Sequence, residues 1–414
     1  MYGLVGKNIQ YSYSTAIHKL LRPDINYQLF DLSETQFQIF MQDKNFSGLN
    51  ITTPYKERIL PYLDSLDVIA NKTQSINTVI KRKDQLVGYN TDYYGFEELI
   101  KHHKIDLRNK VIVILGSGGS SKTLQRYIKK FTKQLIVVSR HPLDNYYSYE
   151  ELRLFPMIDI LINATPVGAF PNIDQSPIQL LKLTARPKIV IDLIYNPPRS
   201  NLLVQAKELG CKTYNGLWML ISQAYLSQSI FFKEIPTAIP AIQLYSSFNK
   251  SNNIVLIGMP TSGKSTIGQM LALKLGKTFI DTDWEIEKTW GISCAEIITT
   301  QGIDAFRAYE RSIVKKVMTS LDCVIATGGG IVENSANIFD LSHFGRIYFI
   351  DRPLELLMPS RSNPLSARRE DLQNLYLSRI SSYRSLCDQR IANSRSLEAC
   401  CNLILEDFHA YCHN

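Results

Sequence analysis

Hydrophobic residues between positions 111 and 195 form four short runs, separated by segments of helix length. The runs occupy residues 111–116, 135–139, 159–166 and 188–195. Continuous apolar runs of this length are typical of parallel strands that are buried on both faces. The pattern therefore predicts an open α/β sheet, and such sheets usually bind ligands at the carboxyl ends of their strands. Residues 1–100 mix shorter strands and helices.

A second α/β pattern begins near residue 253. The apolar run 253–258 is followed by Ile267, Leu271 and Leu275, whose spacing predicts a helix with one face toward a core. The preceding segment, 233–252, carries two prolines and a cluster of Ser and Asn with little periodicity, which indicates a linker. We therefore expect subdomains at 1–100 (completed by about 215–232) and 101–214, a linker at 233–252 and a domain at 253–414.

Length and composition agree with this organisation. The chain has 414 residues, of which 45% are hydrophobic and 20% charged, as in an ordinary globular protein of two or three domains. No apolar run approaches the roughly 18 residues that a membrane span needs. The start, MYGLVGKNIQ, has neither a basic region nor an apolar leader core. We expect a cytoplasmic protein that does not contact a membrane, and the sequence leaves its oligomeric state open.

The formal charge of +8 comes from the first half of the chain. Its densest part, residues 101–133, holds seven lysines without an unbroken basic run. A solvated helix face or a mild attraction for anionic small molecules explains this better than nucleic-acid binding. The seven cysteines form no CxxC pair, which favours reduced thiols. His409, Cys412 and His413 have a helical spacing that metal ligands also use, but they lie at a chain end that usually frays.

Two glycine-rich loops stand between a predicted strand and a predicted helix. Residues 258–265 read GMPTSGKS, which fits the phosphate-binding pattern GxxxxGK followed by Ser or Thr; a plain glycine-rich turn is the alternative. In this pattern backbone N–H groups wrap the phosphates, the lysine reaches the outer phosphates, and the hydroxyl binds Mg²⁺. The expected nucleotide-binding residues are Gly258, Gly263, Lys264, Ser265 and Thr266.

The other loop reads GSGGSS, with Gly116 and Gly118 in the dinucleotide pattern but Ser121 in place of the third glycine. Alone it is equally compatible with a turn that binds nothing. The next predicted strand ends in Ser139 and Arg140, and an arginine there favours NADP over NAD because it can pair with the 2′-phosphate. The expected cofactor-binding residues are Gly116, Gly118, Gly119, Ser120 and Arg140.

Four motifs follow the phosphate loop, and they read FIDTD, AFRAYE, ATGGG and RISSY. In this order they resemble shikimate kinase. The resemblance implies a P-loop α/β fold like that of nucleoside monophosphate kinases, with Mg²⁺ near Ser265 and Asp281 and with Lys264 and Asp283 as catalytic residues. On a continuous strand, Asp281 and Asp283 would point to the same face. The resemblance also implies a substrate site formed by Arg307, oriented by Glu310, and by Gly328, Gly329, Gly330 and Arg379.

One position departs from the kinase pattern. The family usually carries an arginine just before the Pro-Leu of its lid, whereas this chain has Asn363 there. Arg361, Arg368 or Arg369 could supply the missing charge on lid closure, and we take Arg361 as the candidate nucleotide contact. Loss of that charge would lower the rate of phosphoryl transfer.

Residues 2–232 resemble shikimate dehydrogenase through the motifs SYS, NITTPYK, INT, GYNTDYYGF, NATPVG, IYNPP and GLWMLISQA. The resemblance implies Lys56 and Asp92 as catalytic residues. A lysine oriented by a carboxylate can protonate the alkoxide that develops when a ketone accepts a hydride. The implied substrate-binding residues are Ser12, Ser14, Thr52, Asn77, Tyr195 and Gln223. Thr15 and Lys19 depart from the pattern, which affects substrate affinity more than chemistry, and we interpret His18 as structural.

Both resemblances imply the same small-molecule ligand, shikimate. They imply a substrate subdomain and a Rossmann-like NADP subdomain followed by a kinase domain, in a bifunctional enzyme of aromatic amino-acid biosynthesis. With NADP(H) as cofactor it would reduce 3-dehydroshikimate to shikimate, and with ATP and Mg²⁺ it would phosphorylate shikimate to shikimate 3-phosphate. The alternatives are a quinate/shikimate dehydrogenase fused to a weakened kinase, and a non-catalytic sensor that binds shikimate and nucleotide.

Overall fold

The computed structural model describes residues 1–142, 145–236, 238–360, 364–394 and 396–413. The chain divides into two compact units, Met1–Tyr245 and Ser246–Asn414. Each unit is an α/β structure with parallel strands, as the sequence predicts. Among the described residues, no helix combines the length and apolar character that crossing a membrane requires.

The first unit begins with a six-stranded sheet in the order β2-β1-β3-β5-β6-β4. Its strands are β1 (Tyr2–Gly6), β2 (Tyr27–Asp31), β3 (Gly48–Ile51), β4 (Ser65–Leu66), β5 (Thr78–Arg82) and β6 (Gln85–Tyr89). β1 runs parallel to β2 and β3, whereas β5 is antiparallel to β3 and β6. The helices are α1 (Ser14–Leu21), α2 (Glu34–Asp43), α3 (Tyr55–Arg58), α4 (Val68–Thr73) and α5 (Asp92–His102), with a 3-10 turn η1 (Leu60–Tyr62).

A second, fully parallel sheet follows in the order β11-β10-β9-β7-β8. Its strands are β7 (Ile112–Leu115), β8 (Leu135–Val138), β9 (Ile160–Asn163), β10 (Ile189–Asp192) and β11 (Lys212–Asn215). The first four confirm the four apolar runs, and all residues of β7 and β9 are buried. The accompanying helices are α6 (Gly119–Ile128), α7 (Tyr149–Arg153) and α8 (Asn201–Glu208), with a 3-10 turn η2 (Leu180–Lys182).

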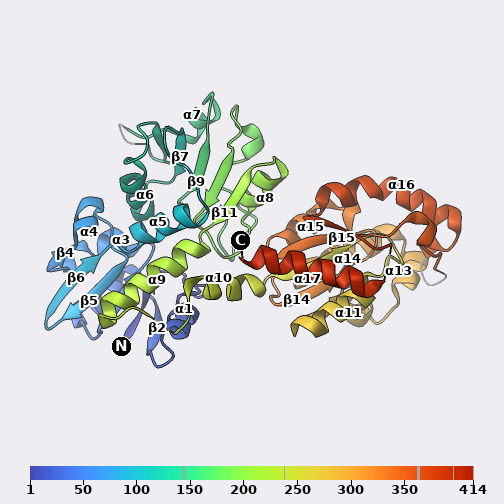
Figure 1. The fold of residues 1–414 in the computed structure, drawn as a ribbon, viewed down its shortest axis with the longest axis horizontal. Helices are drawn as coiled ribbons and strands as arrows, with labels where there is room; N and C mark the ends of the chain where they lie inside the picture. Colours follow the sequence, from blue (N-terminus) through green and yellow to red (C-terminus); the bar gives the residue numbers. More distant parts are fainter. Residues whose placement is uncertain (143–144, 237, 361–363, 395, 414) are drawn as a thin grey trace. The chain divides into compact units, whose positions relative to one another are not determined.

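Helix α9 (Leu217–Phe232) returns the chain to the first sheet. It packs against α1, α5 and β5, and Figure 1 shows it in yellow-green beside these elements. The first subdomain is therefore completed by residues that follow the second sheet. This return explains why a polar residue as late as Gln223 can belong to the same site as residues near the amino terminus.

The segment expected to be a linker contains a helix, α10 (Ala241–Lys250). Leu244 and Tyr245 are buried, and the ring of Tyr245 packs edge to face on Trp218 at 5.1 Å. Two apolar residues are too few to predict a helix from the sequence, and the two prolines that precede them favour a loop. The division between the two compact units falls within this helix, after Tyr245.

The second unit has a five-stranded parallel sheet in the order β13-β14-β12-β15-β16. Its strands are β12 (Asn253–Ile257), β13 (Thr278–Asp281), β14 (Cys323–Ala326), β15 (Gly345–Asp351) and β16 (Gln389–Ala392). Its helices are α11 (Lys264–Leu275), α12 (Thr282–Trp290), α13 (Cys294–Gln301), α14 (Ile303–Val317), α15 (Ser335–Ser342), α16 (Arg369–Leu386) and α17 (Leu397–His413). Short 3-10 turns are η3 (Ile331–Glu333), η4 (Leu354–Leu356) and η5 (Pro364–Ser366).

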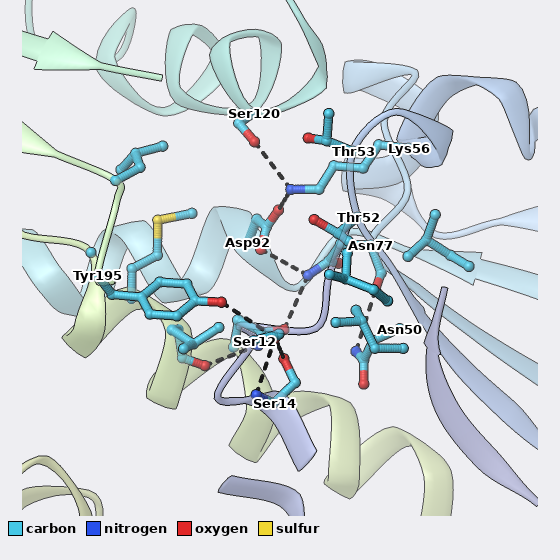
Figure 2. A pocket seen from close by; sticks show the side chains of 18 of the residues that line it. Ser12, Ser14, Asn50, Thr52, Thr53, Lys56, Asn77, Asp92, Ser120 and Tyr195 are labelled. Atoms are coloured by element: carbon cyan, nitrogen blue, oxygen red, sulfur yellow. Dashed lines mark hydrogen bonds and ion pairs between the residues drawn. The ribbon is translucent and has the colours of Figure 1, made fainter. Parts of the chain in front are cut away.

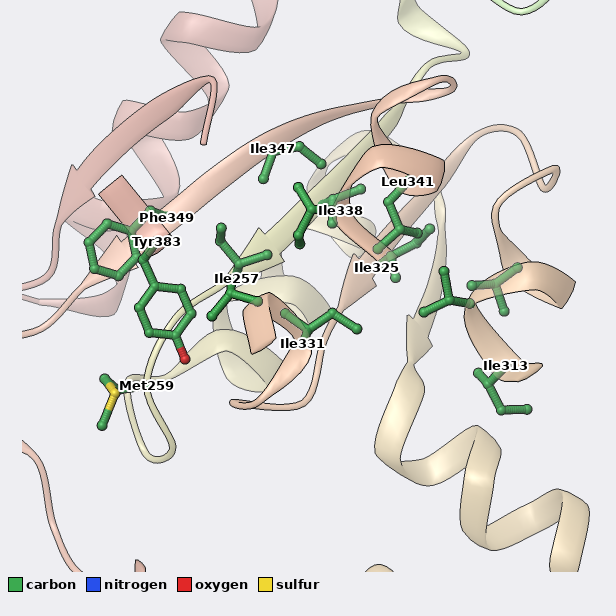
Figure 3. Packing of buried hydrophobic residues seen from close by; sticks show 14 of the residues in the cluster. Ile257, Met259, Ile313, Ile325, Ile331, Ile338, Leu341, Ile347, Phe349 and Tyr383 are labelled. Carbon is green, nitrogen blue, oxygen red and sulfur yellow. The ribbon is translucent and has the colours of Figure 1, made fainter. Parts of the chain in front are cut away.

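Apolar residues cover both faces of this sheet. On one face, Ile257, Ile325 and Ile347 pack with side chains of α14, α15 and α16, as Figure 3 shows. Alternate residues of the same strands pack against α11 and α17 on the other face. The ring of Tyr383 in α16 stacks on Phe349 of β15, with 5.0 Å between ring centroids. This stacking fixes the helix that carries Arg379.

Candidate functional site

A cavity of about 180 Å³ lies in the first unit, where the ends of β1 and β3 meet α5 and α9. The structure brings together all eight residues that the sequence assigns to catalysis or substrate binding in this half of the chain. They are Ser12, Ser14, Thr52, Lys56, Asn77, Asp92, Tyr195 and Gln223. These residues are far apart in the sequence, so only the folded chain unites them.

Lys56 and Asp92 form an ion pair in the wall of this cavity. Lys56 Nζ donates to Asp92 Oδ2 at 2.6 Å and to Ser120 Oγ at 3.0 Å (Figure 2). Asn77 Nδ2 donates to the other carboxylate oxygen of Asp92 at 2.9 Å. The lysine and aspartate side chains are only 14% and 10% exposed, so solvent screens the pair weakly. The lysine is therefore held in one orientation beside the cavity.

Three hydroxyl groups line another part of the cavity. Ser12 Oγ donates to Ser14 Oγ at 3.1 Å, and Tyr195 Oη donates to Ser12 Oγ at 3.3 Å. Burial raises the pKa of Tyr195 to about 12, so its hydroxyl stays protonated at neutral pH. Neutral hydroxyls are suitable donors for a carboxylate of a small ligand.

Asn50, which was not predicted from the sequence, also lines this cavity. Asn50 Nδ2 donates to Ser227 Oγ at 2.9 Å, and its Oδ1 accepts from Tyr27 at 2.8 Å. Asn50 is the first residue of the NITTPYK motif, so the signal was present. Its network partners Tyr27 and Ser227 lie outside every motif and could not be identified without the fold.

A second cavity, of about 800 Å³, shares Thr53, Lys56 and Ser120 with the first. It is lined by all five residues expected to bind a dinucleotide: Gly116, Gly118, Gly119, Ser120 and Arg140. Helix α6 begins here, and no side chain caps its amino terminus. Its first N–H groups can therefore bind the phosphates of a dinucleotide.

Close packing explains the residues of this glycine loop. A Cβ atom at Gly119 would lie 2.5 Å from Ser75 Oγ, so a side chain would push the two segments apart. Ser121, which replaces the usual third glycine, is fully buried and fits in its place. The donor set and the size of this cavity fit a dinucleotide, and Arg140 is an exposed residue of its lining.

The second unit contains a third cavity, of about 470 Å³. Nine residues singled out by the sequence line it: Lys264, Ser265, Asp281, Asp283, Arg307, Gly328, Gly329, Gly330 and Arg379. Gly258, Gly263 and Thr266 belong to the phosphate loop or its helix but do not line the cavity. Gly258 presents its carbonyl to Lys264, Gly263 precedes α11 in a left-handed conformation, and Thr266 is exposed in the first turn of α11.

Lys264 is buried beneath the loop. Its Nζ donates to the main-chain oxygens of Gly258 at 2.9 Å and Met259 at 2.8 Å. Burial lowers the pKa of Lys264 to about 8, because the charged form loses its hydration. A phosphate oxygen would be a stronger partner for this ammonium group than two carbonyl dipoles are. The loop therefore fits the terminal phosphates of a nucleotide.

The expectation that Asp281 and Asp283 share a strand is wrong. β13 ends at Asp281, whose side chain accepts from the backbone N–H groups of Asp283 and Trp284 and so starts α12. Asp283 lies in the first turn of that helix, yet both carboxylates still reach one cavity. Ser265 Oγ donates to Asp281 Oδ2 at 2.6 Å, and these two oxygen ligands suit Mg²⁺.

Asp283 has an unusual environment. Its Oδ1 is buried and has no hydrogen-bond partner among the described residues. Burial and the neighbouring Asp281 raise the pKa of Asp283 to about 6. A carboxylate with this pKa that lines a cavity can accept a proton at neutral pH.

Two arginines line the cavity near the glycines of the ATGGG motif. Arg307 Nη1 donates to both carboxylate oxygens of Glu310, at 3.0 and 3.1 Å. A Cβ atom at Gly330 would overlap the guanidinium of Arg307, so this close approach requires glycine. Arg307 and Arg379 also pair with Glu333, which the sequence analysis did not identify.

The predicted lid contains Asn363, which replaces the usual arginine, and three arginines that could supply the missing charge: Arg361, Arg368 and Arg369. Arg361 and Asn363 lie outside the described residues. Arg368 pairs with Asp371 at 3.0 Å, and Arg369 donates to the main-chain oxygens of Leu357 and Leu354, at 2.6 and 2.9 Å. Neither Arg368 nor Arg369 lines the cavity in this structure.

The described residues contain no group of three or more His, Cys, Asp and Glu side chains arranged to hold a metal ion. Cys412, at the end of α17, is fully buried in an apolar cluster with Ile404 and Phe408. It packs as a core residue of the second unit.

Comparison with family models gives two matches. Residues 4–79 match the shikimate dehydrogenase substrate binding domain, and residues 260–409 match shikimate kinase. The second match includes most of the phosphate loop, both arginines of the cavity and most of α17. The two matches fall in different compact units.

Comparison with individual proteins gives relatives of the first unit. Shikimate dehydrogenase (NADP(+)) of Clostridium botulinum is 38% identical over 241 residues, which are 54% of this chain and 93% of that protein. The crystal structure of shikimate dehydrogenase 1 from Peptoclostridium difficile is 36% identical, with a TM-score of 0.54, and the match covers 56% of this chain and 92% of that one. Shikimate 5-dehydrogenase from Thermus thermophilus, in complex with NADP(H) and shikimate, is 26% identical, with a TM-score of 0.50 and coverage of 57% and 95%.

Proposed function

We propose that this chain, which belongs to the shikimate dehydrogenase family and carries a shikimate kinase domain, reduces 3-dehydroshikimate to shikimate and then phosphorylates shikimate. The observation that carries the proposal is the assembly of each motif set around one cavity. Eight residues of the dehydrogenase pattern surround a cavity that adjoins a dinucleotide-sized one, and nine of the kinase pattern surround a third. The domain limits 1–100 (completed by about 215–232), 101–214, 233–252 and 253–414 are part of this proposal.

In the first cavity, Ser12, Ser14 and Tyr195 would hold the substrate carboxylate through their hydroxyl groups. The ring of the substrate then extends toward Lys56, which lines both the first and the second cavity. NADPH bound in the second cavity supplies the hydride. Lys56 Nζ donates the proton that the developing alkoxide takes up, and Asp92 holds the ammonium group in place.

In the third cavity, Arg307 and Arg379 would bind the carboxylate of shikimate, and Gly328 lets its ring lie close to Asp283. ATP with Mg²⁺, held by Lys264, Ser265 and Asp281, supplies the phosphoryl group. Asp283 accepts the proton of the attacking hydroxyl group, which yields shikimate 3-phosphate. Since Asp283 has its pKa near 6, it is ionised at neutral pH and ready to act as this base.

Separate assays of the two proposed activities, both on the whole protein, test the proposal. Purified protein should oxidise shikimate with NADP⁺ and should release ADP when mixed with shikimate and MgATP. Substituting NAD⁺ or quinate in the first assay distinguishes a quinate/shikimate dehydrogenase. ADP release no greater than in the control without shikimate would favour a weakened kinase or a sensor that binds both ligands without turnover.

A further inference from the structure

The two arginines of the third cavity share one internal counter-ion, Glu333. Its Oε2 accepts from Arg307 Nη2 at 2.6 Å, and its Oε1 accepts from Arg379 Nε at 2.7 Å. Arg379 Nη2 also lies 2.5 Å from Oε1. Glu333 ends the short turn η3, which directly follows the three glycines of the cavity. One carboxylate thus bridges both of the arginines that line the acceptor site.

Most donors of these arginines are already engaged. Arg307 Nη1 is bound to Glu310, and Arg379 Nη1 donates to the carbonyl of Gly329 at 3.2 Å. Among the described residues, Arg307 Nε is the guanidinium nitrogen of this pair that is buried without a partner. A ligand carboxylate that approaches either arginine therefore competes with a protein carboxylate for the same guanidinium group.

Glu333 is the replaceable one of the two glutamates. The Glu310 side chain is fully buried and lies on α14, one helical turn beyond Arg307. The Glu333 side chain is 41% exposed and lies at the end of a single 3-10 turn, so it can rotate into water. Although burial opposes the shift, Arg379 and Arg307 hold the pKa of Glu333 below its usual value, so the side chain carries a full negative charge at neutral pH.

We infer that Glu333 competes with the acceptor's carboxylate for Arg307 and Arg379 and thereby sets the affinity of the kinase site for its acid substrate. This inference rests on the proposed function of the cavity. Without a ligand, Glu333 is the shared counter-ion of two arginines whose side chains are only 17% and 4% exposed. When an acid binds, its carboxylate takes over this role and Glu333 turns to solvent. The exchange favours anionic acceptors, because a neutral molecule cannot replace the charge.

Calorimetric titration of the full-length protein with shikimate, in the absence of ATP, tests the exchange. Every variant carries Lys56→Ala in addition, so that shikimate is not oxidised during the titration. Every sample contains saturating NADP⁺, so that the heat of shikimate binding to the first unit is the same in all titrations. Glu333→Gln keeps the size of the side chain but removes the competing charge. We expect its dissociation constant for shikimate at the kinase site to fall about tenfold, the worth of one charge-assisted hydrogen bond. Glu285→Gln, which removes a carboxylate paired with Lys316 outside the cavity, should leave the constant unchanged.

The methyl ester of shikimate provides the control for charge. Its affinity should not rise in Glu333→Gln, because it brings no carboxylate to the arginines. In steady-state phosphorylation, Glu333→Gln should lower KM for shikimate by the same factor and leave kcat within about twofold. A purely structural role for Glu333 predicts the reverse, since loosened arginines would raise KM and lower kcat.

Glu333→Asp is a second variant that keeps the test possible if Glu333→Gln does not fold. It keeps the charge, but its side chain is one methylene too short to reach both arginines. We expect its dissociation constant to lie between those of the parent and Glu333→Gln. Unchanged or weaker binding of shikimate in both variants would overturn the inference, as would tighter binding of the methyl ester. Absence of any shikimate binding at this site in all variants would also overturn it. Absence of ADP formation with the binding pattern intact would instead count against the proposed kinase activity alone.

Discussion

The dehydrogenase cavity and the kinase cavity hold the lysine and the aspartate expected to be catalytic in opposite ways. In the first, Lys56 and Asp92 each have protein partners, and both oxygens of Asp92 are occupied. In the second, Asp283 has a buried oxygen without a partner among the described residues, and Lys264 donates to main-chain carbonyls. A site that delivers one proton to a ketone benefits from a donor that is already oriented. A site that transfers phosphate receives most of its charge partners with the nucleotide, metal and acceptor.

The largest expected effect comes from removing the oriented donor. Lys56→Ala should lower the rate of shikimate oxidation with NADP⁺ by about a thousandfold or more, because both the proton donor and its charge are lost. Binding of NADP⁺, measured by fluorescence titration, should persist because the glycine loop is untouched. Lys101→Ala, at an exposed ion pair on α5, is the control and should retain activity. Substantial turnover of Lys56→Ala would remove this lysine from the chemistry.

Asp283, whose Oδ1 has no partner among the described residues, is the site of a substitution that should lower activity and raise stability. Asp283→Asn should reduce ADP formation by about 10² to 10⁴-fold, as expected for loss of a general base. Burial raises the folded-state pKa from 3.8 to about 6, so the folded state binds the proton more tightly than the unfolded state. Stability of the wild type therefore falls as pH rises from about 4 to 6.

Asp283→Asn removes this pH-dependent decrease in the free energy of unfolding. At pH 7 the variant should be more stable by up to about 3 kcal/mol, with the difference vanishing below about pH 4. Thermal unfolding of both proteins at several pH values measures the effect. Asp92→Asn is the matched substitution in the other cavity, and it should lower stability because Lys56 then lacks its counter-ion. Stabilisation by both substitutions would abolish the contrast between the cavities.

The pH dependence of phosphorylation sharpens the same contrast. The value of kcat/KM for shikimate should rise about tenfold per pH unit below pH 6 and level off above it, because Asp283 acts as a base only when ionised. A profile that is flat between about pH 5 and 7 would exclude Asp283 as the titrating base.

Motifs located most side chains that line the cavities, because most of these motifs lie at the end of a strand whose apolar run is visible in the sequence. The helix start at Asp281 was missed, since capping competes locally with strand extension and an Asp can do either. Glu333 was missed for a different reason. Its role depends on Arg307 and Arg379, which lie 26 and 46 residues away and meet it only in the folded unit.

Substitution of Asn50 tests whether its buried hydrogen bonds stabilise the walls of the first cavity, and the expected effect is smaller. Asn50→Ala leaves the buried hydroxyl group of Tyr27 without its acceptor and removes one donor from Ser227, which keeps its bonds to Thr78 and Gln223. The free energy of unfolding of the first unit should fall by about 1 to 3 kcal/mol, the usual cost of unsatisfied buried polar groups. Denaturant unfolding followed by near-ultraviolet circular dichroism measures it, with shikimate-dependent ADP release as the control for the second unit. An unchanged transition would show that the network is redundant.

The smallest expected effect concerns the cofactor. Arg140→Ala should raise KM for NADP⁺ by about tenfold and leave KM for NAD⁺ unchanged, because only NADP⁺ carries the 2′-phosphate. Initial rates of shikimate oxidation with each cofactor measure this. Equal changes for both cofactors would show that Arg140 acts on the shape of the cavity rather than on the phosphate.

One coupled assay tests most directly whether both cavities act on the same small molecule. The protein is mixed with 3-dehydroshikimate, NADPH and MgATP, and NADPH oxidation and ADP formation are followed together. We predict that ADP appears only after NADPH oxidation begins and that omitting NADPH abolishes it. Oxidation of NADPH without ADP formation would contradict the account, because it would show that the product of the first cavity is not a substrate of the second unit.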